Sequence, residues 1–131
     1  MTLTVGKLAR AARVGIETVR FYERRGLVEP ESRLPSGYRL YSEASVSRIR
    51  FIRNAQRLGF TLSEISELIE LETRPTVNCG VVQKRALDKI SAIEHKISDL
   101  QKMKRALEVL AQCCDSDRPI RECALMECMT S

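Results

Sequence analysis

The 131-residue sequence contains no Trp, and its three Tyr and three Phe bring the aromatic share to only 5%. So few large aromatic side chains argue against a large independent core and favour burial at a partner surface. No apolar run reaches the ~18 residues that a membrane-spanning helix needs, so no membrane partner is predicted. Lys7, Arg10 and Arg13 interrupt the first apolar positions, which argues against a signal peptide. We therefore expect a cytoplasmic protein.

Features that typically support catalysis are also missing. The sequence has a single His and shows neither a Gly-rich phosphate loop nor a pair of carboxylates arranged for acid–base chemistry. His95 falls in the middle of a predicted helix, on its surface side, and is not expected to bind a metal. These absences predict a protein that is not an enzyme.

Positive charge is concentrated in the first half of the chain. Residues 1–58 carry 12 Lys and Arg, eleven of them Arg, against 5 Asp and Glu, a net charge of +7. Residues 59–131 carry 10 against 12, a net charge of −2. Guanidinium groups match both phosphate and guanine geometrically. A basic half joined to a near-neutral half predicts a nucleic-acid-binding domain joined to a part with another role.

The pattern of the basic half predicts short helices and a hairpin. Apolar spacing indicates helices over 4–12 and 16–25, separated by Val14-Gly15 and ended by Gly26, which is the helix-turn-helix arrangement. On the second helix, Ile16, Val19 and Phe21 are expected to face inward and Arg20 and Tyr22 outward.

Residues 29–37 contain two Pro and one Gly, and 38–41 alternate like a strand. This stretch predicts a small hairpin, or wing, that can reach phosphates. Helices over 43–58, with Phe51 among the inward residues, and 62–72 follow. A capping-box pattern, Thr61 to Glu64, opens the second of them.

Residues 80–112 contain no Pro and no internal Gly, and a helix of this length would extend ~50 Å. Apolar residues recur along it at alternating three- and four-residue spacings, with Lys104 as the one defect. They are Ala86, Ile90, Ile93, Ile97, Leu100 and Leu107. A lone helix has no core to cover this stripe, and folding back on the N-terminal half would hide only part of it. The stripe therefore predicts a homodimer.

The five cysteines are Cys79, Cys113, Cys114, Cys123 and Cys128. An odd number in a cytosolic chain argues against a disulfide framework and favours metal or redox chemistry. Cys79 immediately precedes the long helix, where the helix dipole favours a thiolate. Cys113 and Cys114 follow the helix, and Cys123 closes the loop after it. Cys113 and Cys128 could equally be small buried hydrophobes.

Within one chain Cys79 and Cys114 would lie ~50 Å apart and could not share an ion. If two long helices pair antiparallel, Cys79 of one chain reaches Cys114 and Cys123 of the other. Each dimer would then hold two metal sites, with Cys113 as a possible extra ligand. Metal binding would favour one relative position of the two protomers over another, as a switch requires.

Three motifs of the basic half, VRFYE with Gly26-Leu27, GYRLY at 37–41 and AQRLGFTL at 55–62, resemble the mercury-resistance-regulator (MerR) family of bacterial transcription factors. The resemblance extends over nearly the whole chain. It implies a mainly α fold with four parts: a winged helix-turn-helix DNA-binding domain (1–73), a hinge (74–79), an antiparallel coiled-coil dimerisation helix (80–112), and a metal-binding loop with a C-terminal tail (113–131).

The resemblance also implies a function. Family members bind a palindromic operator in double-stranded promoter DNA as dimers. The metal-free dimer represses, and the metal-bound dimer untwists the DNA so that RNA polymerase can use the promoter. Carried onto this sequence, the DNA-contacting positions are Arg20, Tyr22, Arg33, Tyr38, Arg39 and Tyr41, with Arg53 as an additional backbone contact.

The metal ligands implied are Cys79, Cys114 and Cys123. Family members that sense monovalent copper, silver or gold have Ser before the long helix, so Cys79 indicates a divalent ion. Three thiolates without a nearby His suit a soft ion in trigonal coordination, which favours Hg(II).

Other divalent ions stay open. The tandem Cys113-Cys114 resembles zinc sensors, and Zn(II) would take a fourth ligand from Cys113, Asp115 or Asp117. Cys79-Gly80 and the Arg-Pro within the loop resemble lead and cadmium sensors, which leaves Pb(II) and Cd(II) as alternatives.

Two other functions fit the same residues. One is a thiol redox-sensing regulator, switched by a disulfide between chains or between Cys114 and Cys123 and responsive to peroxide or diamide without metal. The other is a metal-sequestering or adaptor protein whose basic end binds an acidic partner. The adaptor would lack salt-steep, sequence-specific DNA binding.

Overall fold

The computed structural model describes residues 2–112, 117–123, 126–127 and 129. The chain divides into two units, residues 1–79 and 80–131. Three of the five cysteines, Cys113, Cys114 and Cys128, lie outside the described residues. None of the helices in the described part of the chain is long and apolar enough to cross a membrane.

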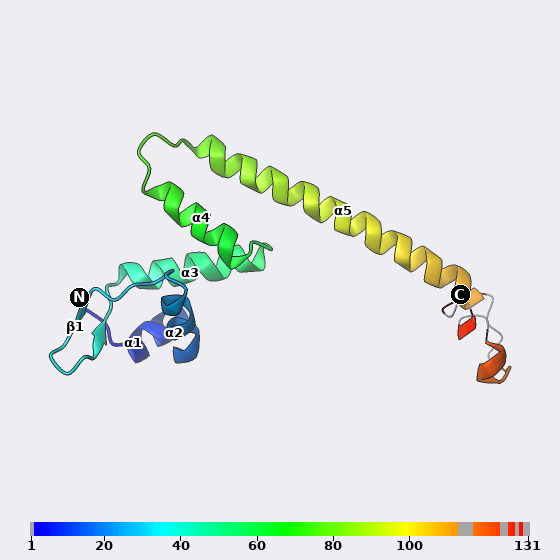
Figure 1. The fold of residues 1–131 in the computed structure, drawn as a ribbon, viewed down its shortest axis with the longest axis horizontal. Helices are drawn as coiled ribbons and strands as arrows, with labels where there is room; N and C mark the ends of the chain where they lie inside the picture. Colours follow the sequence, from blue (N-terminus) through cyan, green and yellow to red (C-terminus); the bar gives the residue numbers. More distant parts are fainter. Residues whose placement is uncertain (1, 113–116, 124–125, 128, 130–131) are drawn as a thin grey trace. The chain divides into compact units, whose positions relative to one another are not determined.

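The N-terminal unit begins with two short helices, α1 (Val5–Ala12) and α2 (Ile16–Arg24), as predicted (Figure 1). The Thr4 side chain caps α1 by accepting a hydrogen bond from the Lys7 N–H at 3.3 Å. Arg13 ends α1 in the left-handed conformation, with φ 58°. Gly26, with φ 74°, follows α2 and lets the chain turn away. The two helices form the expected helix-turn-helix.

The wing is a two-stranded antiparallel ribbon of β1 (Ser32–Arg33) and β2 (Arg39–Leu40). Arg33 stands directly opposite Arg39 in its register. The base of the ribbon is tied to the segment that precedes α1, because the backbones of Leu3 and Tyr41 exchange hydrogen bonds of 2.6 and 2.8 Å. This bridge fixes the wing beside the start of α1.

Two further helices complete the unit, α3 (Ala44–Arg57) and α4 (Leu62–Glu72). The predicted capping box is confirmed: the Thr61 hydroxyl accepts from the Glu64 N–H at 3.1 Å, and the Glu64 carboxylate accepts from the Thr61 N–H at 2.9 Å. The box sets the first residue of α4 just after the turn at Gly59, whose φ is 91°.

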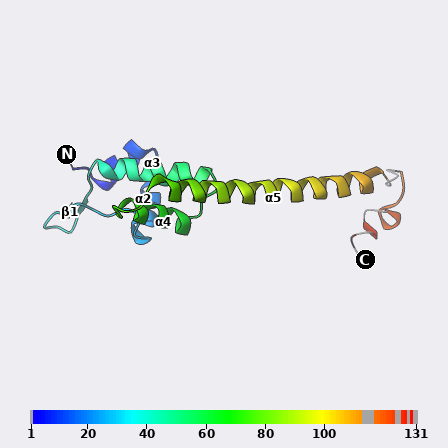
Figure 2. The same ribbon diagram turned by 90° about the horizontal axis from the view of Figure 1, so that it is seen from above.

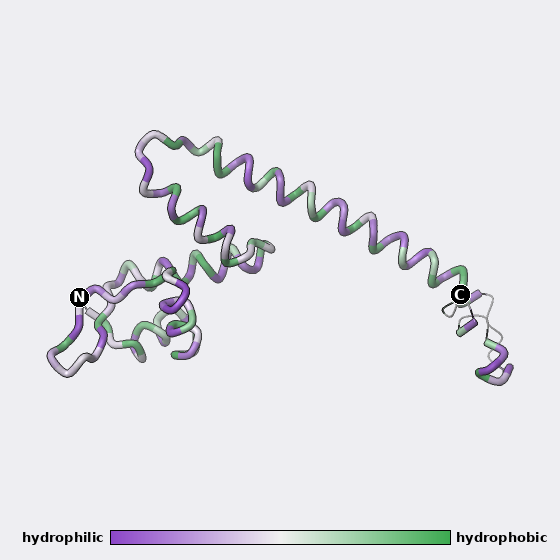
Figure 3. Tube along the Cα trace, viewed as in Figure 1, coloured by the Kyte–Doolittle hydropathy of each residue, from purple (hydrophilic) through white to green (hydrophobic). Residues whose placement is uncertain are grey.

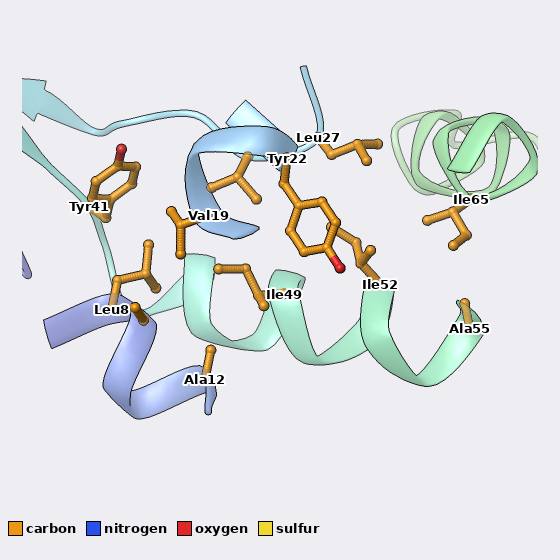
Figure 4. Close-up of a cluster of buried hydrophobic side chains, with 12 residues drawn as sticks. Leu8, Ala12, Val19, Tyr22, Leu27, Tyr41, Ile49, Ile52, Ala55 and Ile65 are labelled. Carbon is orange, nitrogen blue, oxygen red and sulfur yellow. The ribbon is translucent and has the colours of Figure 1, made fainter. Parts of the chain in front are cut away.

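Side chains from all four helices and the wing meet in one hydrophobic core (Figure 4). The largest fully buried ones are Leu8, Val19, Tyr22, Tyr41, Ile49, Ile52 and Ile65. Each aliphatic side chain of this size stabilises the fold by ~1.5–3 kcal/mol through burial. Two of the three tyrosines of the sequence thus belong to the core.

The expected inward orientation is wrong for three residues. Ile16, Phe21 and Phe51 are 41%, 38% and 36% exposed. Residues three apart share a helix face, whereas neighbours point about 100° apart. Once Val19 faces the core, Tyr22 faces it too, and Phe21 is turned outward.

The second unit contains most of the long helix α5 (Cys79–Gln112), 34 residues without interruption (Figure 2), and the short 3-10 turn η1 (Ile120–Glu122). The helix begins one residue earlier than predicted, so Cys79 is its first residue. Hydrophobic and hydrophilic residues alternate along it (Figure 3). Its apolar stripe is exposed in the single chain, with Ile93 and Ile97 at 42% and 50%. Met103 lines a shallow groove with Leu100, Lys104 and Leu107, so an apolar side chain adjoins the Lys104 defect.

Candidate nucleic-acid interface and metal centre

Helix α2 and the wing meet in a groove of the N-terminal unit. It is lined by Val5, Arg20, Gly37, Tyr38, Arg39 and Tyr41. Four of these residues were predicted DNA contacts, and the fold brings them together from two separate stretches of sequence. The groove contains two guanidinium groups and an aromatic ring, Tyr38, that is 52% exposed. Such a surface can bind the phosphates and base edges of DNA.

Arg20 is held only loosely by its neighbours. Its Nη1 lies 3.3 Å from Glu17 Oε1, and the two side chains are 49% and 82% exposed. An exposed pair of this kind contributes little stability and is easily exchanged for another partner. Arg20 can therefore turn to DNA at small cost.

Arg39 is fixed more firmly, through the carboxylate of Glu23. Arg39 Nη1 lies 2.8 Å from Glu23 Oε2, while the Tyr41 hydroxyl donates to Glu23 Oε1 at 2.9 Å. Only 14% of the Glu23 side chain is exposed. Burial, together with the hydrogen bond to Glu23, raises the pKa of Tyr41 above its ordinary value. One carboxylate of α2 thus orients two residues of the wing.

The side chains of Tyr22 and Tyr41, two of the predicted DNA contacts, lie in the hydrophobic core of the N-terminal unit. They are 2% and 0% exposed, and the Tyr22 hydroxyl donates to Gln56 Oε1 at 2.9 Å. Their rings fill the core, and each hydroxyl is used by a partner within the protein. Sequence reasoning missed Glu23 and Gln56 as those partners. The signal available was their position within the same motifs, VRFYE and AQRLGFTL.

The remaining predicted contacts, Arg33 and Arg53, are exposed. Arg33 and Arg39 oppose each other on the wing, so their side chains lie on the same face of the ribbon. Two like charges opposite each other weaken a ribbon, and the Glu23 carboxylate beside Arg39 offsets part of this repulsion. Arg53 lies on α3 and does not line the groove between α2 and the wing.

Of the predicted metal ligands, the structure describes two. Cys79 is exposed at the first turn of α5, and Cys123 follows η1 and is half-buried. No group of three His, Cys, Asp or Glu side chains that could hold a metal occurs within the described part of a single chain. The third predicted ligand, Cys114, and the possible extra ligand, Cys113, lie outside that part. The described donors are thiols, which suit soft metal ions.

Comparison with known families decides the classification. Residues 3–72 match the model for the MerR HTH family regulatory protein, and residues 46–110 match the model described as MerR, DNA binding. The chain belongs to the MerR family. The winged helix-turn-helix followed by a long helix confirms the fold expected from that resemblance, and the relatives are transcription regulators rather than enzymes.

Individual relatives cover almost the full chain. The mercuric resistance operon regulatory protein of Bacillus cereus is 39% identical over 127 residues, 97% of this chain and 96% of that protein. The regulator PbrR691 of Ralstonia metallidurans CH34, solved with lead(II), is 34% identical with a TM-score of 0.88 over 97% of this chain and 98% of its own.

A third relative is the dual-function regulator MerR of Bacillus megaterium MB1, solved with mercury(II). It is 34% identical with a TM-score of 0.76, over 98% of this chain and 100% of its own. These matches identify the chain as a metal-responsive MerR-family regulator. They include proteins associated with two different ions.

Proposed function

We propose that this protein binds an operator in double-stranded promoter DNA and switches transcription when a soft divalent metal binds. The groove between α2 and the wing is the observation that carries the DNA-binding half of this proposal. In it Arg20 and Arg39 supply forked donors for guanine or phosphate, and Tyr38 supplies an exposed aromatic ring. Arg33, opposite Arg39 on the wing, adds a phosphate contact.

The protein acts as a homodimer through α5. A 34-residue helix is ~50 Å long. The apolar side chains of its stripe are exposed in the single chain. Pairing with a second copy removes this surface from water, at ~25 cal/mol for each Å² of apolar area. An antiparallel pair gives a two-fold assembly, which suits a palindromic operator.

The antiparallel pairing also assembles the metal site. Cys79 begins α5 in one protomer, whereas Cys114 and Cys123 follow the end of the helix in the other. Three thiolates from two protomers form a soft, trigonal site that best suits Hg(II), with Cd(II), Pb(II) and Zn(II) as the alternatives. The relative named for mercuric resistance and the mercury-bound relative support Hg(II), and the lead-bound relative supports Pb(II).

Switching follows from the two-chain site. An ion held by both protomers stabilises one relative position of the two DNA-binding units over another. DNA bound by both units is then distorted. The free energy of this distortion is offset by the additional contacts that the distorted DNA makes with the protein. The metal-free dimer represses, and the metal-bound dimer presents the promoter to RNA polymerase in an aligned form.

The decisive experiment titrates the reduced dimer with Hg(II), Pb(II), Cd(II), Zn(II) or Cu(I) and measures transcription from its promoter. We expect Hg(II) to activate at the lowest concentration and Cu(I) not to activate. Activation by another divalent ion at lower concentration would reassign the metal, and activation by none would contradict metal sensing.

A thiol redox regulator is the second candidate, because the Cys79 thiol is exposed. Adding diamide to the metal-free protein distinguishes a redox sensor from a metal sensor. A redox sensor switches with diamide and is reset by reductant, whereas a metal sensor needs the ion and functions in reductant.

A further inference from the structure

Sulfur-containing side chains are concentrated near the C-terminal end of the sequence. The chain contains five Cys and four Met, and residues 123–129 hold four of these nine side chains. They are Cys123, Met126, Cys128 and Met129, of which the structure describes all but Cys128. The proposed metal site takes one ligand, Cys123, from this stretch. The two thioethers are not used by the proposed function.

The backbone of Cys123 is held from both sides. Its N–H donates to the carbonyl oxygen of Ile120 at 3.1 Å, and its carbonyl oxygen accepts from the N–H of Glu127 at 3.1 Å. Cys123 itself is extended, with φ −73° and ψ 124°, whereas Met126 and Glu127 are α-helical. An extended residue whose carbonyl accepts the first hydrogen bond of a helical turn is an N-cap. Cys123 therefore occupies the N-cap position, and Met126 is the third residue after it.

A side chain at the third position after an N-cap can reach back to the cap. Side chains on a helix are tilted toward its N-terminus. In a capping box, as at Thr61 and Glu64 of this chain, the third side chain contacts the N-cap residue itself. Methionine has three rotatable side-chain bonds, so its sulfur adapts to the position of a bound ion. The Met126 thioether can therefore reach an ion that is bound to the thiol of Cys123.

The exposure of these side chains is consistent with a role in binding. Met126 is 49% exposed, Met129 is 68% exposed, and Cys123 is half-buried. Methionine is among the residues most often fully buried, so a half-exposed methionine close to a thiol is not explained by packing within its own chain. Packing against a second copy needs only an apolar side chain of this size, whereas metal binding needs the sulfur atom.

We infer that Met126 donates its thioether sulfur to the metal ion bound by Cys123, as a ligand additional to the three thiolates; this inference rests on the proposed metal-sensing function. A thioether is neutral, so it adds a ligand without adding to the negative charge of the thiolates. Zinc sites in proteins use Cys, His, Asp and Glu ligands, whereas a soft thioether suits a soft ion. Met126 therefore favours Hg(II) over Zn(II) at this site.

Met126→Leu in the full-length reduced dimer tests this role. Leucine is apolar and of similar size, so it keeps the packing of the side chain and removes only the sulfur. Met126→Ala removes both the sulfur and the packing. Met129→Leu is the matched control, because it removes the same group from an exposed position in the same stretch. Thermal unfolding and sedimentation check that every variant is a folded dimer.

Metal affinity is measured by competition, with a small thiol for Hg(II) and with a chelator for Zn(II). We expect both Met126 variants to lower Hg(II) affinity equally, by about tenfold, the lower end of the cost of losing a group that supports a metal site. Zn(II) affinity should be unchanged, and Met129→Leu should bind both ions normally. If only Met126→Ala lowers the affinity, Met126 is a packing residue and the inference is wrong. Equal losses for Hg(II) and Zn(II), or a similar loss in Met129→Leu, would also overturn it.

A spectroscopic measurement observes the thioether directly. In protein that carries an NMR-active carbon isotope at the methionine ε-methyl groups, the signal that disappears in each Leu variant identifies Met126 and Met129. Hg(II) added in an amount equal to the sites should shift the Met126 signal and leave the Met129 signal in place. An unshifted Met126 signal would overturn the inference.

Cys123→Ser distinguishes failure of this inference from failure of the proposed function. If Cys123→Ser abolishes tight Hg(II) binding and Met126→Leu leaves it unchanged, the proposed metal site stands and only the role of Met126 is wrong. If Cys123→Ser also leaves Hg(II) affinity unchanged, the ion is held elsewhere, and the proposed site fails together with the inference.

Discussion

Glu23 of the recognition helix lies 2.8 Å from Arg39 of the wing, through Glu23 Oε2 and Arg39 Nη1. The same carboxylate accepts a hydrogen bond from the Tyr41 hydroxyl, so the helix and the wing share one partly buried anion. Arg39 nevertheless lines the groove proposed for DNA and keeps 41% of its side chain exposed. The ion pair orients the guanidinium, and the exposed nitrogens remain available for DNA.

Replacing Glu23 by Gln tests this orienting role. The amide oxygen can still accept from Tyr41, but the ion pair with Arg39 is lost. We expect a modest loss of stability, about 1 kcal/mol because the arginine is partly solvated, and a larger relative loss of operator affinity. Urea unfolding and DNA titration measure the two. Glu17→Gln, which breaks the exposed pair with Arg20, is the control and should leave stability unchanged; equal DNA affinity in Glu23→Gln would remove the orienting role.

The raised pKa of Tyr41 predicts a pH dependence of stability. A phenol whose pKa is higher in the folded state than the ordinary 10.0 keeps its proton longer when folded. Its contribution is complete below that ordinary pKa and is lost as pH rises through the folded value. The free energy of unfolding should therefore fall at alkaline pH, and Tyr41→Phe should remove this part of the fall. Tyrosinate absorbance followed with pH identifies the late-titrating group; titration of all three tyrosines at the ordinary value would contradict the prediction.

Tyr22 offers a test of its core position. Tyr22→Phe deletes only the hydroxyl that donates to Gln56, and we expect a loss of about 1 kcal/mol with operator affinity unchanged. Tyr22→Ala leaves a cavity and should cost ~3–5 kcal/mol. Thermal or urea unfolding measures both. A large drop in operator affinity for Tyr22→Phe, without a drop in stability, would indicate that the Tyr22 hydroxyl contacts DNA.

The elements of the fold were predictable from sequence because local signals define them. Gly26 and Gly59 stop helices where a positive φ is needed, and Thr61 with Glu64 starts one. The direction of individual side chains was less predictable. Phe21 and Tyr22 are adjacent aromatic residues, and either could occupy the core. Tyr22 occupies it because it shares a helix face with Val19, and its hydroxyl then donates to Gln56, 34 residues further along the chain.

The residues of the candidate site were likewise predictable only in part. Arg20, Tyr38 and Arg39 were predicted for the DNA interface, and they line one groove because the wing folds beside α2. Glu23, the carboxylate that orients the wing, escaped prediction because an acidic residue is not expected in a DNA interface. A metal site shared between two chains depends on a dimer geometry that no contact within one chain defines, so its ligands stay a prediction.

The exposed stripe of α5 predicts how the dimer can be broken. Ile97→Asp places a charge in the middle of the stripe, where pairing would bury it. We expect a monomer, detected by sedimentation, with a folded DNA-binding unit but greatly weakened operator binding. His95→Glu is the control, because His95 lies on the opposite side of the helix and is solvent-exposed. A dimeric Ile97→Asp protein would place the dimer contact elsewhere.

Cys79→Ser separates metal sensing from repression. The exposed thiol at the first turn of α5 is the one proposed ligand that would come from the other protomer. Serine keeps the size and the polarity of the side chain but offers a poor ligand for a soft ion. We expect metal affinity to fall by at least tenfold and induction to be lost, while the metal-free dimer still binds its operator and represses. Transcription and metal binding are measured on the same preparation, with Cys128→Ser as the control that should induce normally. Normal induction in Cys79→Ser would mean that the metal is held without this thiol, and loss of repression would mean that Cys79 stabilises the dimer rather than binding the ion.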